Sequence, residues 1–139
     1  VEELKTLELG IMNLKLYARD EVSAAEQAFS EGYVLLDWGT AFKVRHSREL
    51  SEIAVPVFRT NMARLALESV LNNGGSTYLP EAFASEFVDS GELYLVKDAP
   101  TFSQGVYASY HQGTERENVI EQIRSKLGNS LDQPASKVS

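Results

Sequence analysis

The sequence predicts an α/β domain built around a mixed sheet, and three observations indicate this. Residues 54–80 read as strand, polar turn, helix, glycine break and strand. Residues 33–38 (YVLLDW) form a short apolar run typical of a buried strand. Residues 11–17 and 105–111 alternate apolar and polar side chains, as half-buried strands do. The 139 residues are enough for one domain with a core of its own.

The central segment predicts a βαβ unit, which implies a parallel pair of strands joined by a right-handed crossover. Residues 54–58 are apolar and β-branched, so we expect a strand there. A helix over 61–72 follows from an apolar face with helical spacing, made by Met62, Leu65, Ala66, Ser69 and Val70 and widened by Ala63, Leu67 and Leu71. Gly74 and Gly75 end this helix, and a second strand covers 76–79 before Pro80.

The remaining elements are read in the same way. Alternation predicts strands at 11–17 and 105–111, and a short apolar run predicts another at 93–96. Helical spacing predicts further helices at 20–29, 41–53, 81–89 and 114–127. The helix over 41–53 is expected to be mostly exposed, with apolar contacts at Phe42, Val44 and Leu50. The polar segment after residue 128 predicts a loose tail.

Composition excludes several classes of function. The net charge is −7 and the isoelectric point about 4.8, so the chain lacks the basic surface of a nucleic-acid-binding domain. It contains no cysteine, which excludes disulfides and thiolate metal sites. Neither a signal peptide nor a run of membrane-spanning length is present, so we expect a cytoplasmic protein without a membrane partner. The chain begins at Val1 rather than Met, which suggests a piece of a longer protein.

The sequence offers little catalytic or metal-binding chemistry. His46 and His111 lack neighbours at metal-ligand spacing, so no metal site is expected. Phosphate-cradling and nucleophile motifs are absent, and we expect no cofactor. The acidic residues are scattered, and no pair stands out as catalytic.

The candidate binding residues lie where the predicted strands end. Ligands of open α/β sheets settle outside the carboxyl ends of the strands, beside helix N-termini. Arg59, Thr60 and Asn61 hold that position, and Thr60 or Asn61 is also suited to cap the helix and do nothing more. The segment Trp38, Gly39, Thr40 and Phe42 is the expected neighbouring wall, although both aromatic residues could equally be ordinary core.

The order of these segments resembles the effector-binding domain of LysR-type transcriptional regulators. The resemblance rests on the helix 65–71, the run NGGSTYLP at 73–80, the helix 82–88 and the motif VDSGEL at 88–93. It covers most of residues 4–127. The run Asp37-Trp38-Gly39-x-x-Phe42 also resembles the subgroup of these regulators that controls flagellar genes.

The resemblance implies a type 2 periplasmic-binding-protein-like fold and a division of the chain. Residues 1–20 hold a crossover strand and a remnant of subdomain I, and 21–104 form subdomain II. Residues 105–127 hold the returning crossover strand and the C-terminal helix, and 128–139 a flexible tail. The family's helix-turn-helix, its linker helix and the first half of subdomain I have no counterpart here. DNA would therefore be bound only through a missing N-terminal part.

The resemblance also implies function: effector sensing and homo-oligomerisation, without enzymatic activity. We expect a small anionic effector on Arg59, Thr60 and Asn61, bound weakly because half of the pocket is missing, with Tyr107 reaching the same cleft. We expect self-association through apolar surface around 11–17 and 119–127. Two alternatives stay open: a solute-binding protein of the same fold, and a small α/β enzyme whose carboxylates are not recognised as a pair.

Overall fold

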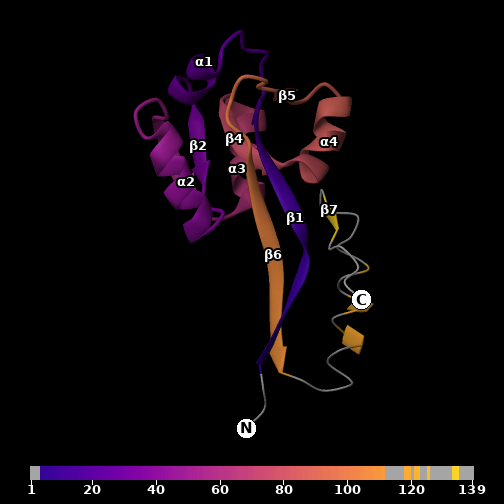
Figure 1. Ribbon diagram of the computed structural model, residues 1–139. Coiled ribbons are helices and arrows are strands. Elements are labelled where there is room, and N and C mark those ends of the chain that lie inside the picture. Colours follow the sequence, from indigo (N-terminus) through magenta and orange to yellow (C-terminus); the bar gives the residue numbers. More distant parts are fainter. Residues whose placement is uncertain (1–3, 112–117, 120, 123–124, 126–132, 135–139) are drawn as a thin grey trace.

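The computed structural model describes residues 4–111, 118–119, 121–122, 125 and 133–134 (Figure 1). Its elements follow one another as β1 (Leu4–Ala18), α1 (Ala25–Ser30), β2 (Tyr33–Leu36), α2 (Thr40–Leu50), β3 (Pro56–Thr60), α3 (Ala63–Asn73), β4 (Ser76–Pro80), α4 (Glu81–Asp89), β5 (Tyr94–Leu95), β6 (Phe102–His111) and β7 (Gln133–Pro134). No helix in this part of the chain is long and apolar enough to cross a membrane.

Among the described residues, seven strands form one mixed sheet, in the order β3-β2-β4-β1-β5, with β6 and β7 also paired to β1. Strand β2 is parallel to both β3 and β4. Strand β1 is antiparallel to all of its partners. The mixed α/β sheet is therefore confirmed. The strands of the predicted βαβ unit, β3 and β4, are not neighbours, because β2 lies between them.

Strands β1 and β6 form a long antiparallel ribbon that extends beyond the helices (Figure 1). The pairing runs from Leu4 opposite His111 to Leu14 opposite Phe102, with a register shift between Glu8 and Gly10. The other end of β1, from Leu14 to Ala18, pairs with β4. We expected 11–17 and 106–111 to lie side by side: the two strands that contain them do pair, but residues 106–111 lie opposite 4–10, and residues 11–14 lie opposite 102–105.

Helices cover both faces of the sheet, and each face has its own core. On one face α1 and α2 pack over an aromatic cluster that includes Phe29, Tyr33, Phe42, Tyr78 and Phe102. On the other face α3 and α4 pack over an aliphatic core made by Val34, Leu36, Ala66, Leu67, Val70, Leu79, Ala84 and Leu93. Successive side chains of β2 point to opposite faces, which explains why Tyr33 and Val34 lie in different cores.

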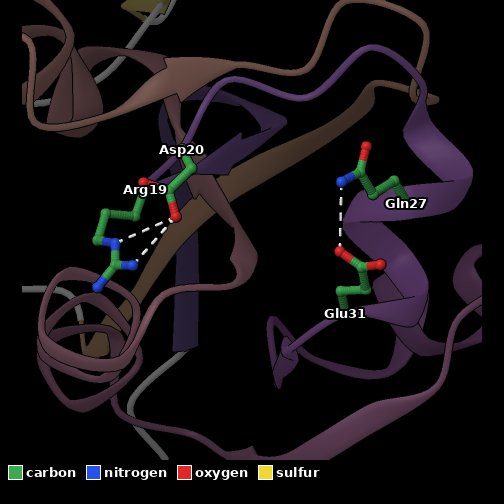
Figure 2. Close-up of polar contacts among 4 residues, drawn as sticks. All are labelled: Arg19, Asp20, Gln27 and Glu31. Carbon is green, nitrogen blue, oxygen red and sulfur yellow. Dashed lines mark hydrogen bonds and ion pairs between the residues drawn. The ribbon is translucent and has the colours of Figure 1, made fainter.

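Glycines bring two turns close together at the amino-terminal end of β4. Gly75 has φ +109°, and a Cβ there would overlap the carbonyl oxygen of Gly32. Hydrogen bonds fix this approach, from Ser76 N–H to Gly32 O (3.2 Å) and from Arg19 N–H to Gly75 O (3.1 Å). Figure 2 shows the flanking polar contacts, in which Arg19 pairs with Asp20 (3.1 Å) and Gln27 bonds Glu31 (3.3 Å).

Several expected boundaries and faces are corrected. Helix α3 starts at Ala63, and its apolar face is narrower than predicted, because Met62 and Leu65 are exposed while Ala66, Leu67 and Val70 are buried. Val44 is also exposed, since it lies on the outer face of α2, whereas His46 is buried. The expected helix over 114–127 and the expected tail lie mostly outside the described residues.

The exposed apolar surface lies only partly where it was predicted, since Val119 in the expected range 119–127 is 52% exposed. Residues 11–17 are buried or half-buried, because β4 and β6 pair with both sides of β1 and the helices cover its faces. The expectation of an uncovered surface there is wrong. Exposed valines instead lie at the sheet edge, where Val55 and Val57 are 61% and 63% exposed beside and on strand β3.

Candidate functional site

Parallel pairing brings the ends of β2 and β3 to the same edge of the sheet. Leu36 lies opposite Thr60, and Asp37 N–H donates to Thr60 O (2.8 Å), so the two strands end side by side. Helix α2 leads from β2 to β3 on one face, and α3 leads from β3 to β4 on the other. The chain therefore passes from β2 outward to β3 and then back across to β4, so the topological switch point of the sheet lies between β2 and β4, next to these two strand ends.

A groove runs between helix α2 and strand β3 at this edge, and we call it the α2–β3 groove. Its volume is about 520 Å³, within the range of small-molecule sites. Apolar residues form part of its lining, namely Leu35, Leu36, Phe42, Ala54 and Pro56. Polar and charged residues form the rest, namely Asp37, Lys43, His46, Ser47, Ser51, Arg59, Thr60 and Asn61. The structure thus brings Phe42, Arg59, Thr60 and Asn61 together, four of the predicted site residues.

The positive charges of the groove are not equivalent. Lys43 Nζ lies 3.1 Å from Asp37 Oδ2, so its charge is already matched by a carboxylate. The Gly39 N–H, which donates to Asp37 Oδ1 (2.8 Å), and then Lys43 hold the pKa of Asp37 below its usual value. Arg59 forms no side-chain hydrogen bond or ion pair with any described residue. Its guanidinium is therefore the group best placed to meet an anion.

His46 forms the inner wall of the groove and was not predicted as a site residue. Its Nε2 lies 2.8 Å from the hydroxyl of Tyr33, and the two rings stack at 5.8 Å. Burial, and secondarily the charge of Arg59, lower the pKa of His46 below its ordinary value of 6.5. Burial also raises the pKa of Tyr33, so its hydroxyl keeps its proton and can donate to a neutral imidazole.

Neither Thr60 nor Asn61 is the N-cap of helix α3. The N-cap is Met62, which has no side-chain capping bond, because the turn lies one residue later than predicted. The Thr60 Oγ1 accepts a hydrogen bond from Met62 N–H (3.1 Å), just before the helix starts. Asn61 is exposed beside the groove. The first-turn N–H groups of α3 are thus left without side-chain caps among these residues.

Trp38 lines a different groove from Phe42. Its indole N–H donates to Tyr78 O (3.0 Å), and it faces a hollow of about 450 Å³ shared with Ala63, Pro80, Ala82, Phe83, Ser85 and Glu86. Gly39, with φ +102°, and Thr40 lie at the start of α2 and line neither groove. The predicted wall is therefore divided between the two grooves.

The residue of β6 that reaches the end of β2 is Gln104 rather than Tyr107. The Gln104 Nε2 donates to Trp38 O, and its Oε1 is buried without a hydrogen-bond partner in the described structure. Tyr107 lies three residues further along the ribbon, opposite Glu8, and is 61% exposed. It lines neither groove, since three strand residues correspond to about 10 Å.

A hydrogen bond and a cation–π contact also join helix α2 to strand β6. Arg45 Nη2 donates to Ser103 O (2.7 Å), and its guanidinium lies 5.8 Å from the centre of the Phe102 ring. These contacts join the groove to the crossover ribbon. No sequence signal indicates Arg45 or Gln104, because their roles arise only when β6 passes the start of α2. Within the described residues, no cluster of three His, Cys, Asp or Glu is placed to hold a metal ion.

Solved structures of regulatory proteins have this fold. The regulatory domain of HypT from Salmonella typhimurium, bound to bromide, superposes with a TM-score of 0.67 at 15% identity, over 92% of this chain and 66% of that one. Full-length LysG from Corynebacterium glutamicum, with bound effector Arg, gives 0.64 at 14% identity, over 98% of this chain and 49% of that one. The fold is thus that of LysR-type regulatory domains, which are type 2 periplasmic-binding-like domains.

Curated relatives agree with the fold. The chain is 28% identical over 144 residues to the HTH-type transcriptional regulator HdfR of Yersinia enterocolitica, and 25% identical over 146 residues to HdfR of Yersinia pestis. These matches cover 97% and 99% of this chain. Nearly the whole chain is therefore similar in sequence to part of these transcriptional regulators.

Two further findings concern the length of the relatives and the family models. The chain spans about half the length of the curated relatives it matches, 48% and 49%. No family model matches the sequence.

Proposed function

We propose that this chain is the effector-sensing part of a cytoplasmic LysR-type DNA-binding regulator, and that it binds a small anionic effector at the carboxyl edge of its sheet. The observation that carries the proposal is the guanidinium of Arg59, unpaired among the described residues, in the α2–β3 groove where strand β3 ends. The curated relatives, which are transcriptional regulators rather than enzymes, support the regulatory role.

The charge of the effector follows from the groove rather than from the fold. One structural neighbour holds a bromide ion and another holds arginine, so domains of this fold accept ligands of opposite charge. In this chain Asp37 is occupied by Lys43 and by a backbone N–H, whereas Arg59 has no partner among the described residues. Arg59, Thr60, Asn61 and Phe42 are the proposed contacts in the α2–β3 groove. Trp38 shapes the adjacent groove, and Gly39 and Thr40 form the turn between β2 and α2 that separates them.

The wider organisation belongs to the same proposal. DNA is bound through a part outside this chain, whose net charge of −7 does not suit a DNA surface. The regulator is a homo-oligomer. The division into 1–20, 21–104, 105–127 and 128–139, and the link to flagellar genes, remain proposals.

DNA binding by the whole gene product tests this function. The product of the complete gene and the 139-residue chain are each titrated into labelled DNA from the region upstream of that gene, and fluorescence anisotropy is recorded. The whole product should bind with an affinity that falls steeply as salt increases, and the chain alone should not bind. Binding by the chain alone, or no specific binding by the whole product, would contradict the proposal.

A further inference from the structure

We propose that the ligand of the α2–β3 groove is an amphiphilic monocarboxylate, with its carboxylate on Arg59 and its apolar body over Leu35 and Pro56. This inference rests on the proposed function and names the chemical class of the effector. Its basis is the division of the groove lining into a cationic end and an apolar floor.

The cationic end carries a single charge that is free to bind. Lys43 is 3.1 Å from the carboxylate of Asp37, and buried His46 is held towards its neutral form. Among the described lining residues, Arg59 is the remaining cation, and it has no ion pair. A planar guanidinium matches the geometry of a carboxylate, and Asn61 beside it can add an amide donor. One unmatched cation favours a monoanion, because the second charge of a dianion would meet Asp37.

The apolar floor gives the ligand its second requirement. Leu35, Ala54 and Pro56 are half-buried and line the groove between α2 and β3, together with the fully buried Phe42. A small hydrophilic anion would leave this surface in contact with water, whereas an alkyl or aryl body would cover it. Exposed Arg59 is screened by solvent, so the charge alone gives weak binding, and most of the affinity should come from the apolar body.

A series of straight-chain carboxylates tests the proposal on the isotope-labelled 139-residue chain. Acetate, butanoate, hexanoate and octanoate are titrated below their micelle concentrations, and ¹H–¹⁵N spectra follow the Asn61 carboxamide. The indole N–H of Trp38, the chain's only tryptophan, reports the neighbouring groove. Affinity should rise two- to fourfold for each added methylene, with shifts at Asn61 and not at Trp38.

Matched variants separate the two ends of the ligand. Arg59→Met, which removes the charge and keeps an unbranched side chain, should weaken hexanoate at least tenfold. Arg64→Met removes an arginine of the neighbouring helix whose Nε pairs with Glu68 at 3.4 Å, and hexanoate affinity should stay within twofold of the parent. Hexylamine and hexanol should bind at least tenfold more weakly than hexanoate.

Each other outcome overturns the inference. Equal affinity for acetate and octanoate would show a simple anion site, and equal affinity for hexanol and hexanoate a purely apolar one. Unchanged affinity in Arg59→Met, shifts at Trp38 in place of Asn61, or no binding at all would also contradict it. The regulatory role is tested separately by DNA binding of the whole gene product, so the two failures can be told apart.

Discussion

The hydroxyl of Tyr33 lies 2.8 Å from Nε2 of His46, and this buried pair joins the aromatic core to the α2–β3 groove. Tyr33 comes from β2 and His46 from α2, so the contact also fixes the helix on the sheet. Among the described charged groups, Arg59 acts on the pKa of His46 from β3, whereas Lys43 and Asp37, which also line the groove, are matched to each other.

We predict that His46 makes folding stability depend on pH. Its pKa in the folded state is lowered from 6.5, so the unfolded chain binds the proton more readily. Stability from neutral His46 is complete above pH 6.5 and is lost as the pH falls through the lowered folded pKa. The slope contributed by one proton is at most about 1.4 kcal/mol per pH unit. Urea unfolding of the parent and of His46→Gln between pH 5 and 8 should show a steeper decline in the parent. Equal slopes would exclude this role for His46.

We predict that Gly75→Ala strongly destabilises the chain. The new Cβ would overlap the Gly32 carbonyl oxygen at a φ of +109°, so two backbone segments would have to separate. The free energy of unfolding should fall by at least about 3 kcal/mol. Gly91→Ala is the control, because Gly91 also has positive φ (+82°) but nothing lies within 4 Å of its Cβ, and it should cost only about 1–2 kcal/mol. Similar losses in the two variants, measured by chemical unfolding, would show that the steric argument is wrong.

The sequence predicted most elements because their patterns are local. Glycines, prolines and apolar spacing placed α3, β4 and α4 within two residues of their positions. The order of the strands in the sheet depends on pairing between distant segments, so no local pattern predicts it. Residues 54–80 predict two parallel strands, but nothing in that segment shows that β2 lies between them.

The candidate site was predictable in part for the same reason. Arg59, Thr60 and Asn61 follow one strand, and Phe42 starts the helix after its neighbour, so parallel pairing brings them together. The sequence analysis placed Trp38 in the same wall as Phe42. Adjacent residues at a strand end point to opposite faces of the sheet, so Asp37 lines the α2–β3 groove and Trp38 lines the neighbouring groove. His46 could have been found from its spacing with Phe42 on one helical face. Gln104 could not, because its contact with Trp38 depends on the register of β6.

We predict that the chain self-associates through the edge strand β3. An unpaired edge with exposed apolar side chains favours pairing with another chain. Val57→Glu, at a side chain that is 63% exposed, should shift the protein to monomers in sedimentation velocity, with stability changed by less than about 1 kcal/mol. Val44→Glu is the control on the outer face of α2, where the side chain is 52% exposed, and it should leave association unchanged. A monomeric parent at high concentration, or equal effects of both variants, would refute this prediction.

The most direct measurement of the central claim is the response of DNA binding to ligand in the whole regulator. The DNA affinity of the complete gene product is measured with and without the carboxylate that binds its effector domain most tightly, for the parent, Arg59→Met and Arg64→Met. Arg59 lines the groove, whereas Arg64 pairs with Glu68 outside it. Only Arg59→Met should therefore lose the effect of the ligand on DNA affinity. Its DNA affinity without ligand should stay within about threefold of the parent, a change of roughly 0.7 kcal/mol. A ligand response that survives in Arg59→Met, or that is absent from the parent, would contradict the account.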